Sequence, residues 1–102
     1  MFIKPCASMV LKFDKKFYRD LNKINDKELI SEILPKIILN VKKANDISEI
    51  NNLKHLEKYS VRYRIKIKIT DRRTYRIGVI IRRNAVWFVR LLHRKKIYKQ
   101  FP

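Results

Sequence analysis

The sequence is poor in glycine, cysteine and acidic side chains. Its 1 glycine excludes the P-loop and the dinucleotide fingerprint, because both need several glycines to bring backbone close to phosphate. Its 1 cysteine, Cys6, excludes an intramolecular disulfide and a cysteine-based zinc site, and it favours a cytoplasmic location. The longest apolar run, residues 77–81, is far shorter than the roughly 20 residues of a membrane span. The N-terminal residues do not have the pattern of a secretory signal.

Basic charge is what the sequence has in excess. It holds 26 Lys and Arg against 9 Asp and Glu, a net charge of +17. The excess is uneven: residues 1–60 hold 12 basic and 8 acidic side chains, whereas residues 61–102 hold 14 basic side chains and a single acid, Asp71. Self-repulsion of this size predicts an anionic partner, and charge alone leaves nucleic acid, an acidic protein and a membrane surface as candidates.

The length predicts one domain with one modest core, spanning residues 1–102 with an irregular leader at residues 1–8. Hydrophobic residues make up 46% of the chain, enough to form that core. No internal repeat or linker divides the chain, so the charge asymmetry is interpreted as two faces of one domain. Residues 44–56 are polar with scattered aliphatics and predict a connection with a helical turn.

The N-terminal half predicts a strand followed by a helical hairpin. Met9–Phe13 has the short apolar character of a strand, and Asp14 and Asp26 are each placed to cap a helix. Pro35 lies inside the second helical pattern and predicts a bend near Leu34. The apolar residues that recur at helical spacing are Phe13, Phe17, Leu21 and Ile24 in the first helix, and Leu29, Ile30, Ile33, Leu34, Ile37, Ile38 and Val41 in the second.

The C-terminal half predicts a three-stranded antiparallel meander over residues 62–70, 75–81 and 85–92, followed by a short docked helical turn. The first of these strands alternates basic and apolar side chains at period two, so one of its faces is apolar and the other basic. The predicted fold class is α+β: the N-terminal strand and helical hairpin pack on one face of the antiparallel sheet, and the opposite face is basic. The basic set of the first strand is Arg62, Arg64, Lys66 and Lys68.

These residues suit metal-free phosphodiester chemistry better than acid-pair or metal chemistry. Asp71 is the only acid after residue 60, and His55 and His93 lack partners at metal-ligand spacing. Cations can clamp a scissile phosphate and offset the charge that grows on its oxygens. If the target is RNA, its own 2′-hydroxyl can serve as the nucleophile. A solvated surface or a nonspecific nucleic-acid patch is the commoner interpretation of a basic strand face.

Proton transfer needs a group that titrates. His93 titrates near neutrality when unperturbed, and dense positive surroundings favour the neutral amine of Lys66 or the phenolate of Tyr98. Trp87 and Phe88 are neighbours on one strand and point to opposite faces. Core packing is the default interpretation for both, and stacking on a base or packing against a partner peptide is the alternative for one of them.

The order of several short segments resembles the RelE/ParE superfamily of bacterial toxin–antitoxin toxins. The segments, which together span residues 9–102, are Phe13-Asp-Lys-Lys-Phe-Tyr-Arg-Asp-Leu21, Asn52-Leu-Lys-His-Leu56, Tyr63-Arg-Ile-Lys-Ile67, Tyr75-Arg-Ile-Gly78 and His93-Arg-Lys-Lys-Ile-Tyr98 with a terminal Phe101-Pro102. The sequence departs from the family pattern after Leu56, where Glu57 replaces a common glycine.

The resemblance implies a curved antiparallel sheet packed on a helical hairpin, and a toxin that cleaves mRNA in the ribosomal A site without metal or small-molecule cofactor. It implies a cognate antitoxin that wraps the toxin, and no membrane partner. Carried over by position, it assigns phosphate stabilisation to Arg76, proton transfer to Lys66 or His93, and a catalytic role to Tyr98. Substrate clamping falls to Arg64, Arg94 and Lys95. Two alternatives are a ParE-like noncatalytic inhibitor of DNA gyrase and a basic RNA-binding module without catalysis.

Overall fold

The computed structural model describes residues 9–101, except for the side chains of residues 98–100. The predicted leader at residues 1–8, with Cys6, lies outside the described residues. No helix within residues 9–101 is long and apolar enough to cross a membrane. The elements are β1 (Val10–Phe13), α1 (Lys15–Lys23), the π-helical turn η1 (Leu29–Ile33), α2 (Leu34–Lys43), the 3-10 turn η2 (Ile47–Glu49), β2 (Leu53–His55), β3 (Arg62–Lys68), β4 (Thr74–Arg82), β5 (Ala85–His93) and α3 (Arg94–Gln100).

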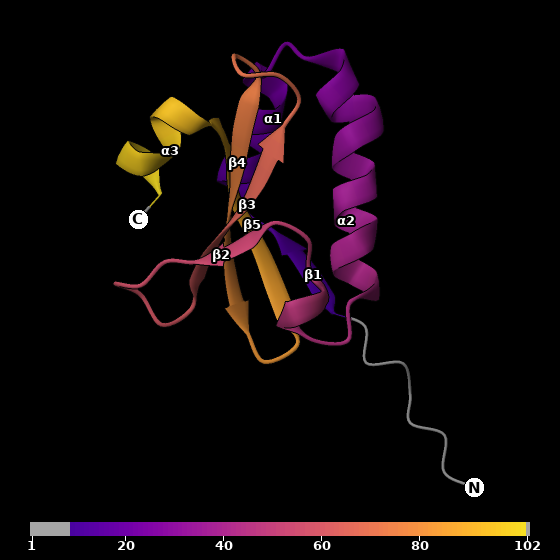
Figure 1. Ribbon diagram of the computed structural model, residues 1–102, viewed down its shortest axis with the longest axis vertical. Helices are drawn as coiled ribbons and strands as arrows, with labels where there is room; N and C mark the ends of the chain where they lie inside the picture. The colour runs from indigo at the N-terminus through magenta and orange to yellow at the C-terminus, as the bar shows by residue number, and fades with distance from the viewer. Residues whose placement is uncertain (1–8, 102) are drawn as a thin grey trace, which may run out of the picture.

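The five strands form one sheet in the order β1-β5-β4-β3-β2, with helices on both of its sides (Figure 1). Strands β3, β4 and β5 pair antiparallel, as predicted for the three-stranded meander, and the α+β class is confirmed. Two details differ from the prediction. Strand β1 joins the edge of the sheet, parallel to β5, instead of packing on one of its faces. Strand β2 is a three-residue edge strand inside the segment predicted as a connection.

The helical hairpin begins where the capping residues predict. The Asp14 carboxylate accepts the Lys16 N–H at 2.8 Å, and the Asp26 carboxylate accepts the Leu29 N–H at 3.2 Å. A bend was predicted near Leu34; at this place the structure has the π-helical turn η1, which ends one residue before α2 begins with Leu34 and Pro35. Proline lacks an N–H and clashes with the preceding turn, and the wider turn accommodates it before α2 continues.

The core lies between this hairpin and one face of the sheet, which we call the inner face. Phe17, Leu29 and Val41 from the helices are almost fully buried, and so are Ile77 and Phe88 from the sheet. Figure 1 shows α2 on the inner side and α3 on the other, which we call the outer face. Side chains on the inner face of the sheet therefore pack against the helical hairpin, whereas those on the outer face lie on the side of α3.

The predicted helical turn at the C-terminus is the helix α3, and it covers part of the outer face. Ile97 and Phe101 are buried there. The Phe101 ring lies so close over Gly78 that a Cβ atom added at Gly78 would stand 2.5 Å from it. This close approach is the structural reason for the single glycine of the chain.

Two buried carboxylates fasten the hairpin to the sheet. Asp20 of α1 accepts hydrogen bonds from the Arg90 guanidinium at 2.8 and 3.0 Å and from the Leu91 N–H at 2.9 Å. Asp26 accepts from the Arg73 guanidinium at 3.0 and 2.7 Å and from the Tyr75 hydroxyl at 3.0 Å. Buried charges are tolerated when they are paired and hydrogen-bonded in this way.

Candidate functional site

The strand register gathers four cations on the outer face. Ile65 and Ile67 of β3 are buried, whereas Lys66 is exposed between them on the other side. Lys66 pairs with Arg76 of β4, and Arg64 pairs with Lys54 of β2. Because directly paired residues share a face, Lys54, Arg64, Lys66 and Arg76 project from three neighbouring strands in the same direction.

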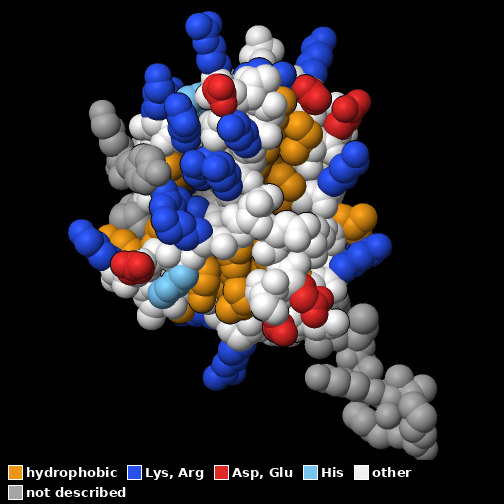
Figure 2. All heavy atoms as spheres, viewed as in Figure 1, with side chains coloured by type: hydrophobic (Ala, Val, Ile, Leu, Met, Phe, Trp, Pro, Cys, Tyr) orange, Lys and Arg blue, Asp and Glu red, His pale blue; other side chains and the backbone are white. Residues whose placement is uncertain are grey.

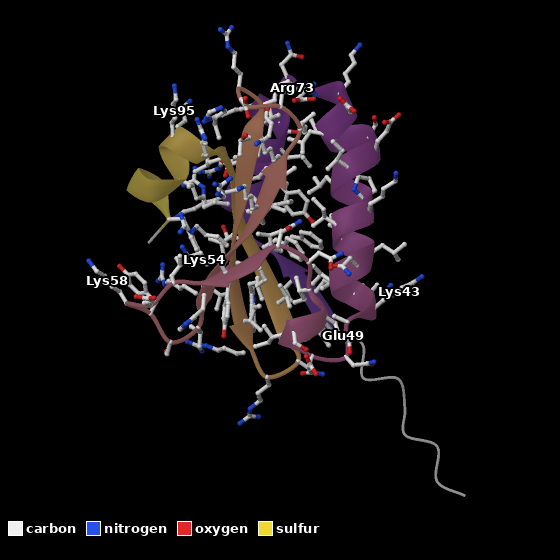
Figure 3. The ribbon with its side chains drawn as sticks, in the orientation of Figure 1. Lys43, Glu49, Lys54, Lys58, Arg73 and Lys95 are labelled. Carbon is white, nitrogen blue, oxygen red and sulfur yellow. The ribbon has the colours of Figure 1, made fainter. Side chains whose placement is uncertain are left out.

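These four side chains line one cavity of about 330 Å³, together with Asn52 and Leu53; we call it the cation cavity. Figure 2 shows Lys and Arg side chains gathered on the side of the molecule that carries α3, and Figure 3 shows Lys54 on the β2 segment beside them. The family resemblance assigned Arg64, Lys66 and Arg76 to the site, and the structure brings these three together. Lys54 was missed, because β2 is too short for its alternation to be read.

Backbone geometry shapes the edge of the cation cavity. Asn52 has a φ of 61°, in the left-handed region that asparagine tolerates better than most residues. In this conformation its carbonyl accepts the Lys66 N–H at 3.1 Å and ties the start of β2 to β3. The pairing of β3 with β4 on its other side places Lys66 opposite Arg76.

A second cavity of about 490 Å³ adjoins the first and shares Lys54 and Arg64 with it. It reaches from the β2–β3 loop to the end of α3, where the Arg62 guanidinium lies 5.2 Å from the Tyr59 ring centroid and 5.6 Å from that of Phe101. Its remaining lining residues include four titratable side chains, those of His55, Glu57, Lys58 and Tyr59. The lining set is Lys54, His55, Leu56, Glu57, Lys58, Tyr59, Arg64 and Phe101.

Three of the four cations of the cavity have no acidic partner among the described residues. Within residues 9–101, no acidic side chain lies at ion-pair distance from Lys54, Lys66 or Arg76. The Arg76 guanidinium donates one hydrogen bond, to the Tyr75 carbonyl at 3.3 Å. Side chains of like charge that line one cavity attract an anion, so phosphate oxygens are suitable ligands.

The inner-face cluster around Asp26 is electrostatically different. Hydrogen bonds from Arg73 are the main reason that the pKa of Asp26 falls to about 2, and the amide of Leu29 and the hydroxyl of Tyr75 add to the effect. Burial and the hydrogen bond to Asp26 raise the pKa of Tyr75. The cation of this cluster, Arg73, is thus held by acids of the helical hairpin.

The structure does not bring His93 into the cation cavity. The register pairs His93 with Tyr75, which packs against the core, and pairs Arg76 with Leu92, so His93 points to the opposite face from Arg76. Both of its ring nitrogens are engaged: Nε2 lies 2.8 Å from the Arg72 carbonyl, and Nδ1 accepts the Lys95 N–H at 3.3 Å. His93 thus serves as the N-cap of α3.

The other predicted residues lie on α3. Arg94 and Lys95 occupy its exposed first turn, and neither lines the two cavities just described. Figure 3 shows Lys95 pointing away from the sheet. The side chain of Tyr98 lies outside the described residues. No group of three or more His, Cys, Asp or Glu side chains within the described part of the chain is arranged to hold a metal ion.

Comparison with known proteins gives a consistent result. The chain is 32% identical over 98 residues to Toxin RelE3 of Methanocaldococcus jannaschii, an alignment that covers 92% of this chain and 100% of that protein. It also resembles a chain of the RelB-RelE antitoxin-toxin complex from Methanococcus jannaschii, with a TM-score of 0.60, 28% identity and coverage of 89% of this chain and 99% of the other. A conserved hypothetical protein of Helicobacter pylori shares the fold, with a TM-score of 0.52 at 18% identity over 85% of this chain and 96% of the other. No profile of a known protein family matches the chain.

Proposed function

The chain belongs to the RelE family of toxins of toxin–antitoxin systems, and on this premise we propose that it is an endoribonuclease that cleaves mRNA on the ribosome and so inhibits translation. One observation carries the proposal: Lys54, Arg64, Lys66 and Arg76 from three adjacent strands line a single cavity. A phosphodiester fits such a site better than any neutral ligand does, because each non-bridging oxygen can be paired with a cation.

The proposed reaction needs no metal ion and no cofactor. The 2′-hydroxyl of the RNA loses its proton and its oxygen bonds to the adjacent phosphorus, while the bond to the 5′-oxygen breaks and that oxygen takes up a proton. Arg76 and Arg64 bind the phosphate oxygens and stabilise the charge that develops on them. Lys66, which stands directly opposite Arg76 in the sheet, exchanges the proton with the attacking or leaving oxygen.

The proposal includes a protein partner. The matched solved structure is an antitoxin–toxin complex, and we propose that this chain also binds a cognate antitoxin. An acidic or amphipathic antitoxin segment over the outer face would compensate the cations of β3 and β4 and block access to the cation cavity. The proposed targets, mRNA and the ribosome, place the activity in the cytoplasm.

A reconstituted translation reaction tests the function. The purified chain is added with a defined mRNA, and the ends of the RNA are mapped by primer extension. We expect cuts in register with the codons, dependent on ribosomes and unaffected by a metal chelator. If the mRNA stays uncut and the chain instead inhibits DNA supercoiling by gyrase in a separate assay, the result supports a gyrase inhibitor. If the chain shows neither activity, the result supports a noncatalytic RNA-binding module.

A matched pair of lysine variants ties the cleavage to the cation cavity. Lys66 and Lys68 are exposed, share the outer face of β3 and are two residues apart, but only Lys66 lines the cavity. We expect Lys66→Ala to lower the cleavage rate by about 100-fold, a typical effect of losing a proton-transfer group. Lys68→Ala should leave the rate within about twofold, and equal losses in the two variants would argue that only the overall charge of the face matters.

A further inference from the structure

The outer face carries a second basic cavity, at the opposite edge of the sheet from the cation cavity. Its volume is about 570 Å³ and it lies where β1 and α1 meet β5. Four of its lining residues are cations that lie within eight consecutive positions, 12–19, and one is the only tryptophan of the chain. The lining residues are Lys12, Phe13, Asp14, Lys15, Lys16, Arg19 and Trp87; we call this site the Trp87 surface.

Trp87 stands on the outer face with part of its ring accessible. Its neighbour Phe88 is fully buried in the core, so the alternation of β5 directs Trp87 outward. The ammonium group of Lys12 lies 4.9 Å from the centroid of the Trp87 ring. A smaller cavity of about 270 Å³, lined by Asp14, Ile80, Arg82, Trp87 and Val89, adjoins the same ring. The indole is therefore a planar surface beside open space with a cation already at its face.

The cations of the Trp87 surface are not compensated by the protein. Within residues 9–101, none of Lys12, Lys15, Lys16 and Arg19 forms an ion pair with an acid. Asp14 is the one acid in the lining, and its carboxylate accepts the Lys16 N–H at 2.8 Å as the cap of α1. The charge of this surface therefore attracts an anionic ligand.

A continuous row of residues connects the Trp87 surface to the cavities on the other side of α3. The register places Lys12, Trp87, Ile80 and Arg62 opposite one another on four adjacent strands. Three strand spacings separate the ends of this row, or about 14 Å. Arg62 lies beside Tyr59 and Phe101, which line the 490 Å³ cavity. One extended anionic chain can therefore touch both regions.

We propose that the Trp87 surface binds single-stranded RNA, with a base stacked on the indole and the neighbouring phosphates on Lys12, Lys15, Lys16 and Arg19. An aromatic ring among cations is the usual means of holding a single strand without sequence preference. An acidic peptide would use the cations but has no base to place on the ring. This inference adds a second RNA contact to the proposed nuclease, and it concerns binding at a place remote from the cation cavity.

The single tryptophan makes the test specific, because excitation at a wavelength that the 5 tyrosines of the chain do not absorb gives emission from Trp87 alone. A short 2′-O-methyl oligoribonucleotide, which the proposed nuclease cannot cut, is titrated into the protein. We expect saturable quenching of the Trp87 emission. The same oligomer without bases, and a polyglutamate peptide, should bind through charge but leave the emission nearly unchanged.

Variants separate stacking from charge. Trp87→Leu keeps an apolar side chain and should weaken binding of a dye-labelled oligoribonucleotide about tenfold, measured by anisotropy. Lys16→Gln should lower the slope of log affinity against log salt by about 0.7, the share of one phosphate contact. Lys43→Gln is the matched control: this exposed lysine ends α2 (Figure 3), does not line the Trp87 surface and should not change the slope.

Several results would overturn the inference. The first is a Trp87 emission that does not respond to the oligoribonucleotide. The second is equal quenching by the base-free oligomer. The third is equal quenching by polyglutamate, which would point to an acidic protein as the ligand. Arg76→Ala serves to keep the two proposals apart. If no cleavage is found but the RNA quenches Trp87 in both the native chain and the variant, the nuclease proposal fails and the RNA-binding proposal for the Trp87 surface stands. If Arg76→Ala abolishes the quenching, the Trp87 surface is not an RNA contact separate from the cation cavity.

Discussion

Arg73 and Arg76 lie three residues apart on the same stretch of chain and have opposite surroundings. Arg73 is bound by Asp26 at 2.7 and 3.0 Å and by Glu28 at 3.0 Å, and it joins the β3–β4 turn to the helical hairpin. Among the described residues, Arg76 forms no ion pair and donates its one hydrogen bond to a backbone carbonyl, and it lines the cation cavity. One arginine is a structural part of the fold, and the other is available to a ligand.

The same contrast holds for the two faces of the sheet. The chain has 9 acids, and three of them, Asp20, Asp26 and Glu28, bind arginines that secure the hairpin. The only acid after residue 60, Asp71, is exposed and pairs with Lys68 at 3.1 Å, outside the cation cavity. Charge repulsion is therefore relieved where the fold needs it and left in place where an anion is expected to bind.

The largest effect that this comparison predicts is on cleavage by Arg76→Ala. The variant removes a group that we propose to stabilise the charge on the phosphate, and losing one such donor typically costs about 100-fold to 1,000-fold in rate. The thermal midpoint should hardly change, because Arg76 has no acidic partner within residues 9–101. Cleavage assays and thermal unfolding on the same preparation check both parts, and a fall in stability that matches the loss of activity would show that Arg76 too is structural.

Asp26→Ala should have the reverse phenotype. It leaves the Tyr75 hydroxyl and the Leu29 N–H without their acceptor and takes from Arg73 its buried partner, so we expect the free energy of unfolding to fall by about 3 kcal/mol. Urea unfolding measures this loss. Below the unfolding transition the variant should still cleave RNA. Glu28→Ala is the control: its side chain is 49% exposed, and its removal should cost less than about 0.5 kcal/mol.

The difference between the two arginines could not be predicted from the sequence. Both lie in a basic segment, and nothing local distinguishes them, because Asp26 is 47 residues away from Arg73 along the chain. The parts that were predictable rest on local patterns. Strict alternation located Arg64 and Lys66 on one face of β3, and capping residues located the starts of the helices.

The residues that the sequence misplaced or missed depend on long-range pairing. The position of His93 at the end of β5 is set by its pairing with Tyr75, which places it on the inner face, and no local pattern shows this. Lys54 belongs to a strand of three residues, too short to be recognised by alternation. The parallel pairing of β1 joins residues that are about 75 positions apart.

Gly78→Ala is expected to disturb the two faces unequally. The added Cβ meets the Phe101 ring at 2.5 Å, and this ring must move away from the outer face. Overpacking of this kind costs about 2 kcal/mol, and the displaced end of α3 should also lower cleavage. Thermal unfolding and cleavage assays measure the two effects. In a Phe101→Ala background the same substitution should cost much less, and equal costs in both backgrounds would rule out the contact as the cause.

The smallest expected effect is the dependence of stability on acid. The hydrogen bonds from Arg73 lower the pKa of Asp26 to about 2, below its ordinary value of 3.8, so the unfolded chain takes up the proton first as the pH falls. This contribution to stability is complete above pH 4 and is lost toward pH 2; between pH 5 and pH 3 the loss is about 1 kcal/mol. Urea unfolding across this range should show a flatter profile for Asp26→Asn.

Two controls assign that acid dependence to the inner face. The hydroxyl and amide of Ser48 lower the pKa of the exposed Asp46, so Asp46→Asn removes another acid-sensitive group but should flatten the profile less than Asp26→Asn does. Arg76→Ala should leave the profile unchanged, because Arg76 binds no carboxylate within the described residues. If Arg76→Ala changed the pH dependence of the free energy of unfolding and Asp26→Asn did not, the roles assigned to the two arginines would be reversed. The reason is that a cation makes stability depend on acid only when it binds a carboxylate, whose protonation then destabilises the folded state.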